Sequence, residues 1–198
     1  MSPEIGAGDG DERTVGLVLA AGAGTRYGRP KILVAGWLER AVRALRDGGC
    51  DTVAVVTGAA RPPLPAGSRE IHCAGWERGI GASLREGLTR AGADAGRVVV
   101  HLVDTPDVHA GVVRRVLDHV GYRLGRAVYD GRPGHPVVIP HAHRRPLLDA
   151  LRDEDGAGPY LRSHPHATAE CADLATGEDI DVVDPGQAPV DLMEGSGP

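Results

Sequence analysis

Short apolar runs alternate along the chain with stretches in which apolar residues recur at helical spacing. Three runs rich in Val and Leu lie at 15–19, 52–57 and 97–103. Three segments with apolar side chains three or four positions apart lie at 38–45, 84–91 and 112–120. The continuous runs are typical of strands buried on both faces of a sheet, and the spaced segments of amphipathic helices. Their alternation predicts a three-layer α/β fold with a mostly parallel sheet.

The second half of the chain continues the pattern with shorter elements. Two strands are predicted near 126–129 and 136–139, helices near 144–152 and 157–163, and a last strand near 167–172. Residues 61–68 are rich in proline and are predicted to form a loop. Ser83 and Glu86 have the spacing of a capping box, which predicts that a helix begins at Ser83.

The ends of the chain differ in composition from the part between them. Residues 1–13 and 186–198 lack apolar periodicity, so we expect two disordered tails around a single domain over 14–184. A length of 198 residues is sufficient for one domain with a substantial core.

Charge and composition exclude several classes of protein. The net charge of −5 argues against nonspecific nucleic-acid binding, which needs a broad basic surface. No apolar run approaches the roughly 20 residues of a membrane span, so no membrane partner is expected. Three widely separated cysteines favour a reducing, cytoplasmic location.

The glycine-rich, basic segment 19–31 is the strongest indication of a binding site. Glycines let backbone N–H groups approach an anion, and cations neutralise its charge. A Walker-type loop needs Ser or Thr after its lysine, whereas Ile32 follows Lys31. A dinucleotide-binding turn needs a helix that opens from the glycines, and Pro30 interrupts it. The segment instead matches a nucleotidyltransferase loop, in which Leu-Ala-Ala-Gly is followed by Gly, Arg, Gly and Pro-Lys. A simple surface turn is the remaining alternative.

Two aspartates are candidate ligands of a divalent cation. Asp104 directly follows the run 97–103, and ligands of α/β sheets gather beyond the carboxyl ends of the strands. Hard cations need more than one carboxylate or phosphate oxygen, and Asp181 is the candidate second ligand. The alternatives are an ordinary turn aspartate at 104 and a solvated acidic segment around 181.

The predicted turn 130–135 holds Arg132 and His135, the candidate residues for binding a second substrate. His135 could contact a phosphate or a ring of that substrate. It could equally serve only to fix the turn between the two strands.

These motifs resemble the MobA-like nucleotidyltransferase superfamily and, within it, the MocA-type molybdenum cofactor cytidylyltransferases. The resemblance covers most of residues 14–184. It rests on Leu19 through Lys31, Trp76 through Leu88, Val103 through Val108, Tyr129 through Pro136, and Asp179 through Asp181. It implies a Rossmann-like, GT-A-like nucleotidyltransferase fold.

The resemblance also implies a magnesium-dependent transfer of CMP from CTP to molybdenum-molybdopterin, with release of pyrophosphate. Ala21 favours CTP, because Leu-Ala-Ala-Gly tends to accompany CTP in this group and Leu-Ala-Gly-Gly to accompany GTP. The implied catalytic residues are Lys31, Arg26 and Asp104. The implied nucleotide-binding residues are Leu19, Ala20, Ala21, Gly22, Gly24, Lys31, Gly79, Ser83 and Asp104. Asp104 and Asp181 would hold Mg2+, and Arg132 and His135 would bind the acceptor.

The chain departs from the family pattern at several points. Lys31 lies only a few residues from Trp37, and the last motif continues as Val-Val-Asp-Pro185. A segment that usually contains arginine reads Asp153-Glu-Asp-Gly-Ala-Gly158. Two alternatives therefore stay open: transfer to another phosphorylated acceptor, such as a sugar phosphate or cofactor precursor, and a non-catalytic maturation factor that delivers nucleotide or pterin to a molybdenum enzyme.

Overall fold

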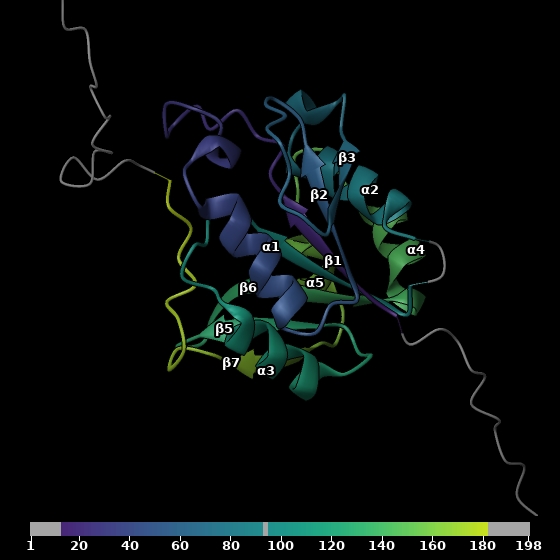
Figure 1. Ribbon diagram of the computed structural model, residues 1–198. Helices are drawn as coiled ribbons and strands as arrows, with labels where there is room; N and C mark the ends of the chain where they lie inside the picture. Colours follow the sequence, from purple (N-terminus) through teal and green to yellow (C-terminus); the bar gives the residue numbers. More distant parts are fainter. Residues whose placement is uncertain (1–12, 93–94, 182–198) are drawn as a thin grey trace, which may run out of the picture.

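A seven-stranded sheet in the order β3-β2-β1-β4-β6-β5-β7 forms the middle layer of the molecule (Figure 1). The structure, a computed structural model, describes residues 13–92 and 95–181. The strands are β1 (Thr14–Leu19), β2 (Thr52–Thr57), β3 (Ser68–His72), β4 (Arg97–Leu102), β5 (Gly125–Tyr129), β6 (Arg132–Pro140) and β7 (Ala167–Glu170). The helices are α1 (Trp37–Asp47), α2 (Ile80–Arg90), α3 (Ala110–Val120), α4 (His141–Ala150) and α5 (Gly158–Ser163), with 3₁₀ turns at Lys31–Leu33 and Trp76–Arg78.

The sheet is mostly parallel, as the alternation of strands and helices predicts. β1 pairs in parallel with both β2 and β4, β2 with β3, and β5 with β7. Only β6 runs against the other described strands, since it pairs antiparallel with both β4 and β5. The predicted α/β fold with a mostly parallel sheet is confirmed.

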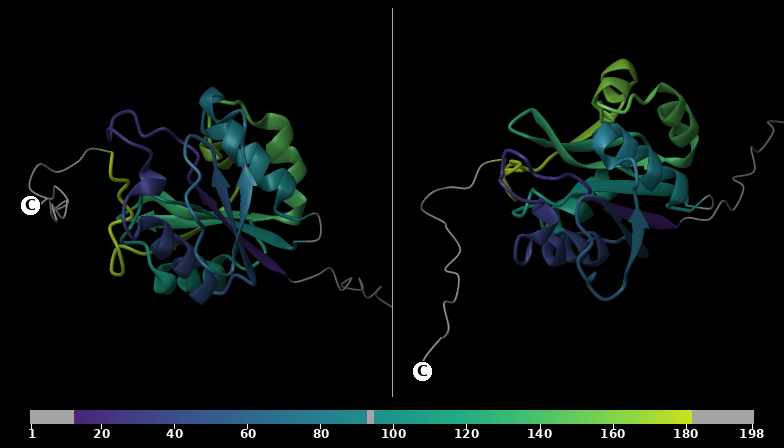
Figure 2. Two further views of the ribbon diagram at one scale, coloured as in Figure 1. Left: turned by 45° about the horizontal axis from the view of Figure 1, so that its top comes forward. Right: turned by 90° about the horizontal axis from the view of Figure 1, so that it is seen from above.

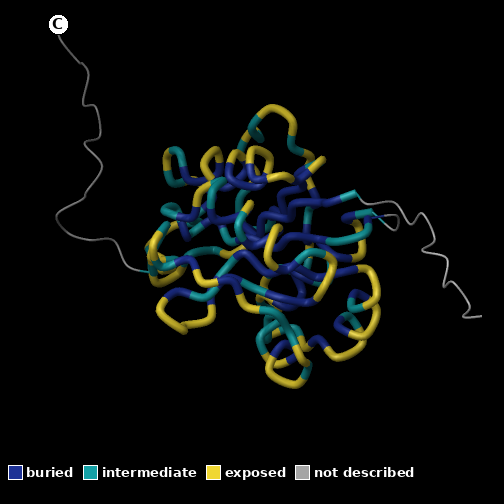
Figure 3. The backbone as a smooth tube through the Cα atoms, turned by 90° about the horizontal axis from the view of Figure 1, so that it is seen from below, coloured by how far each residue is buried: buried dark blue, intermediate teal, exposed yellow. Residues whose placement is uncertain are grey.

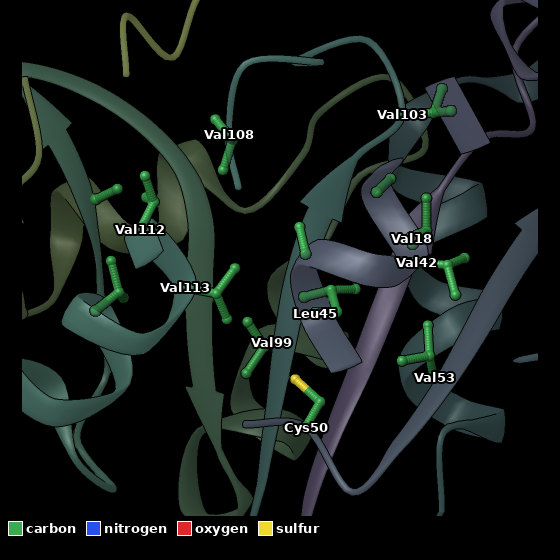
Figure 4. Close-up of a cluster of buried hydrophobic side chains, with 14 of the residues drawn as sticks. Val18, Val42, Leu45, Cys50, Val53, Val99, Val103, Val108, Val112 and Val113 are labelled. Atoms are coloured by element: carbon green, nitrogen blue, oxygen red, sulfur yellow. The ribbon is translucent and has the colours of Figure 1, made fainter. Parts of the chain in front are cut away.

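Helices cover both faces of the sheet and bury two apolar cores. On one face α1 and α3 pack on the strands through residues such as Leu45 and Val113, next to Val18 and Val99 (Figure 4). On the other face α2, α4 and α5 bury a separate cluster that includes Leu84. The strands β1, β2 and β4 are accordingly buried along most of their length, whereas exposed positions are frequent in the surrounding helices and loops (Figure 3).

Three local expectations differ from the structure. β3 was not expected, because at this edge of the sheet only Ile71 of its five residues is buried and no apolar run marks it. The turn of the β5–β6 hairpin is shorter than predicted, since β6 already begins at Arg132.

The predicted capping box is wrong. α2 begins at Ile80, so Ser83 lies inside the helix, where it is buried. The N–H groups of Gly81 and Ala82 donate to the carbonyl of Asp153 at 2.8 and 3.3 Å. A distant backbone acceptor thus replaces the side-chain cap.

The predicted tails, 1–13 and 186–198, lie outside the described residues except for Arg13. The Arg13 carbonyl accepts the N–H of Gly96 at 3.0 Å. No helix in the described part of the chain is long and apolar enough to cross a membrane.

His101 on β4 gives the fold a dependence on pH. Its side chain is fully buried, and neither ring nitrogen has a hydrogen-bond partner among the described residues. Burial lowers the pKa of His101 to about 4, although the nearby Asp107 carboxylate partly opposes this shift.

We expect the free energy of unfolding to fall as the pH drops from about 6.5 towards 5, because the unfolded chain takes up a proton that the folded chain does not bind. The substitution His101→Leu should remove about 1.4 kcal/mol per pH unit from this slope. Urea unfolding at a series of pH values measures it. An unchanged slope in the variant would contradict the prediction.

Candidate active site

The residues with candidate chemistry surround a cleft of about 590 Å³ at the carboxyl ends of β1 and β4. These strands are parallel neighbours, so the segments that follow them leave the sheet at the same edge. The cleft is lined by the loop after β1, the start of α2, the end of β4, and the C-terminal residues Asp179 and Asp181. Figure 2 shows this C-terminal segment close to the loop that follows β1.

A tight turn at Gly24 shapes the loop after β1. The N–H of Gly28 donates to the Gly24 carbonyl at 2.8 Å, and Gly24 has a φ of 61°. A Cβ at Gly24 would lie 2.0 Å from the carbonyl oxygen of Arg29, so only glycine fits this turn. Among the described residues, the N–H groups of 22–27 donate to no protein acceptor. The residues that carry these groups line the cleft.

A cluster of four charged side chains lines the cleft. The Lys31 ammonium lies 2.7 Å from Asp104 Oδ2 and 2.7 Å from Asp181 Oδ1. Arg26 lies 2.8 Å from the second oxygen of Asp181. The structure therefore brings together the candidate catalytic residues Lys31, Arg26 and Asp104 and the candidate metal ligand Asp181.

The charges in this cluster stabilise one another. Burial alone would lower the pKa of the Lys31 ammonium, but its hydrogen bonds to Asp104 and Asp181 outweigh that effect and raise the pKa. The hydrogen bond from Lys31 lowers the pKa of Asp181, with a further contribution from the charges of Lys31 and Arg26. Lys31 thus stays cationic and Asp181 anionic at neutral pH.

The donor set fits a hard divalent cation. Asp104 Oδ1 is buried and has no hydrogen-bond partner among the described residues, and Asp181 supplies further carboxylate oxygens. The described residues contain no group of three or more His, Cys, Asp or Glu side chains that could hold a metal ion. A cation here would complete its coordination with phosphate oxygens and water, which is the usual arrangement for Mg2+.

Asp181 reaches the cleft on a segment that we call the C-terminal strap, residues 171–181. The strap leaves β7, and the N–H of Ile180 donates to the carbonyl of Asp104 at 2.9 Å. This backbone hydrogen bond places Asp181 beside Asp104, although the two are far apart in sequence.

Trp76 also lines the cleft. A Cβ at Gly58 would lie 2.7 Å from Trp76 Cβ and 2.6 Å from the Ala21 carbonyl, so the absence of a side chain lets the indole approach the loop. Ile80, 43% exposed, lines the cleft next to it. The position of Trp76 at the start of the motif Trp76 through Leu88 was the signal of this residue in the sequence.

The other predicted nucleotide-binding residues all line the same cleft. They are Leu19, Ala20, Ala21, Gly22, Gly24, Gly79 and Ser83.

The predicted acceptor residues do not line this cleft. Arg132 is exposed and pairs with Glu178 at 3.4 Å. His135 lies in β6, where its carbonyl accepts the hydroxyl of Tyr129 at 2.7 Å, and burial lowers the pKa of its imidazole to about 3. Their role in acceptor binding stays a prediction.

The family model of the MobA-like NTP transferase domain matches residues 16–168. The chain belongs to this family. The resemblance to the MobA-like superfamily is therefore confirmed, while the role of residues 19–31 in nucleotide binding stays a prediction. A search of curated proteins found no match.

Solved structures with the same fold include other nucleotidyltransferases. The chain is 27% identical to Rv0371c from Mycobacterium tuberculosis, with a TM-score of 0.65 over 80% of this chain and 86% of that one. A homologue from Mycobacterium sp. strain JC1 is 23% identical, with a TM-score of 0.70 over 86% and 91%. The 2-C-methyl-D-erythritol 4-phosphate cytidylyltransferase of Thermus thermophilus is 23% identical, with a TM-score of 0.59 over 88% and 94%. Rv0371c has also been crystallised in complex with manganese.

The substitution Gly24→Ala should weaken nucleotide binding about tenfold or more, because a left-handed alanine costs about 1–2 kcal/mol and its Cβ would also displace the Arg29 carbonyl. Isothermal titration with a magnesium-nucleotide complex measures the change. Gly121→Ala is the matched control, since Gly121 has a φ of 62° but open space around its Cβ position. Equal affinity of the two variants would contradict the proposed role of the turn.

Proposed function

We propose that residues 14–184 form one domain that transfers CMP from CTP to a phosphorylated acceptor, molybdenum-molybdopterin, and releases pyrophosphate. The observation that carries the proposal is the convergence of Lys31, Asp104 and Asp181 beside a glycine-rich loop with unpaired N–H groups. The coarser assignment, a nucleotidyltransferase, follows from the family.

The reaction needs positioning more than a strong base. A phosphate monoester with a second pKa of about 6 is largely dianionic at neutral pH. Its oxygen would attack the α-phosphorus of the nucleotide, forming one P–O bond while the bond to the bridging oxygen of the leaving pyrophosphate breaks. The requirements are alignment of the reactants and neutralisation of the developing charge.

Lys31 and the loop supply these requirements. The N–H groups of 22–27 bind phosphate oxygens, and the Lys31 ammonium turns from the two carboxylates to the triphosphate. Asp104 and Asp181 are then free to hold Mg2+, which would neutralise phosphate charge. Because one ammonium stabilises both carboxylates in the free protein, nucleotide and Mg2+ should each strengthen the binding of the other.

The acceptor is supported by the sequence resemblance alone. Arg132 and His135 do not line the cleft, and this favours a second candidate, transfer to a different phosphorylated acceptor such as a sugar phosphate. Pyrophosphate release with a panel of phosphorylated acceptors separates the two candidates.

The substitutions Lys31→Ala and Asp104→Ala should each lower turnover by about 10² to 10³ or more, because each removes a charge that balances the transferring phosphoryl group. The measurement is magnesium-dependent pyrophosphate release from CTP with molybdopterin. Arg145→Ala, which removes an exposed arginine on α4 paired with Asp149, serves as the control. Near-normal rates in either cleft variant would contradict the assignment.

Among CTP, GTP, ATP and UTP, each with Mg2+, we expect CTP to raise the melting temperature most, because Ala21 favours CTP. A ligand that binds only the native state stabilises it. Thermal unfolding with each nucleotide at one concentration measures this. A larger shift with GTP would overturn the choice of cytidine. Binding of CTP without pyrophosphate release from any acceptor would favour the non-catalytic maturation factor.

A further inference from the structure

One carboxylate outside the charge cluster holds the C-terminal strap. Asp107 Oδ2 accepts the N–H of Thr176 at 2.6 Å, the Thr176 hydroxyl at 2.7 Å and the N–H of Gly177 at 3.2 Å. Asp107 Oδ1 is buried and has no hydrogen-bond partner among the residues that the structure describes. The side chain therefore commits its hydrogen bonding to the strap.

The strap also packs closely where Asp107 holds it. A Cβ at Gly177 would lie 2.1 Å from the ring of Tyr129, and Gly177 has a φ of 64°. The Tyr129 hydroxyl donates to the His135 carbonyl, which fixes the ring in the β5–β6 hairpin. Gly177 thus packs between the Asp107 carboxylate and the Tyr129 ring.

The strap and the loop after β4 run past each other in opposite directions. Asp107 binds Thr176 and Gly177, and three residues earlier in the loop the Asp104 carbonyl binds Ile180. The two attachments are thus three residues apart on the loop. Asp181 follows Ile180 directly, so it lies next to the second attachment.

Two exposed ion pairs of the strap are weaker anchors. Arg132 and Glu178 form a pair at 3.4 Å, with side chains 59% and 65% exposed. Asp173 pairs with the exposed Arg115 well before the cleft. Ion pairs exposed to this degree contribute little because water screens them.

We propose that Asp107 is a positioning residue that anchors the strap and thereby fixes Asp181 beside Asp104 to complete the cation site. This inference rests on the proposed function, because it assigns Asp181 to the cation that accompanies the nucleotide. Asp107 acts through Asp181 and need not touch substrate itself.

A double-mutant cycle tests the inference, with Mn2+ in the presence of CTP as the probe and electron paramagnetic resonance of free Mn2+ as the measurement. Asp107→Ala should weaken Mn2+ binding about tenfold, and Asp181→Ala at least as much. The double variant should bind no more weakly than Asp181→Ala alone, because residues that act through one group are not additive. Asp173→Ala, which removes a carboxylate from the same strap, should bind Mn2+ as the unmodified protein does.

Hydrogen exchange provides a readout that needs no ligand. In Asp107→Ala the amides of Thr176 and Gly177 should exchange faster, while the melting temperature of the domain changes little. Should Asp107→Ala fail to fold, Thr176→Val and Gly177→Ala loosen the same attachment from the strap side and should give the same signature.

The outcomes separate the two proposals. If the unmodified protein binds no Mn2+ with CTP, the proposed function fails. If it binds Mn2+ but Asp107→Ala leaves the affinity unchanged, or if the two substitutions are additive, the positioning role of Asp107 is overturned while the proposed function stands.

Discussion

The sharing of one ammonium between two carboxylates is the interaction on which the candidate site depends. Asp104 and Asp181 face the same small volume, and two carboxylates so close would repel each other without a cation between them. Lys31 removes this repulsion at 2.7 Å from each. In the free protein the ammonium thus holds the two carboxylates close together, and a ligand that drew the ammonium away would expose them.

The topology of the sheet explains why these groups meet. β1 and β4 are parallel neighbours, so the loop that carries Lys31 and the turn that carries Asp104 leave the same edge. Glycines allow the close approaches that follow: Gly24 closes the loop on the Arg29 carbonyl, and Gly58 admits Trp76 beside it. The cleft is thus a product of strand order combined with a few positions that tolerate no side chain.

Sequence patterns predict the elements whose burial is complete and miss those whose partners are distant. The run at 52–57 coincides with β2 because both faces of that strand are covered. The edge strand β3 alternates poorly and leaves no such pattern. α2 begins three residues before Ser83 because the Asp153 carbonyl caps it, and a backbone acceptor more than 70 residues away has no local signature.

The same distinction applies to the site. The loop 19–31 is recognisable because glycine, arginine and lysine have fixed positions within one short segment. The proximity of Asp104 and Asp181 was expected from the oxygen ligands that a hard cation needs, whereas the bridging position of Lys31 was not. The attachment of the strap by Asp107 depends on a contact between residues 69 positions apart and could only be seen in three dimensions.

The late position of Asp181 in the chain has a consequence for folding. The sheet is complete once β7 has formed at Glu170, but the carboxylate that faces Lys31 follows only with the strap. Formation of the sheet therefore does not require the strap, whereas the contact of Asp181 with Lys31 does. The charge cluster is complete only when the strap has attached to the framework that supports it.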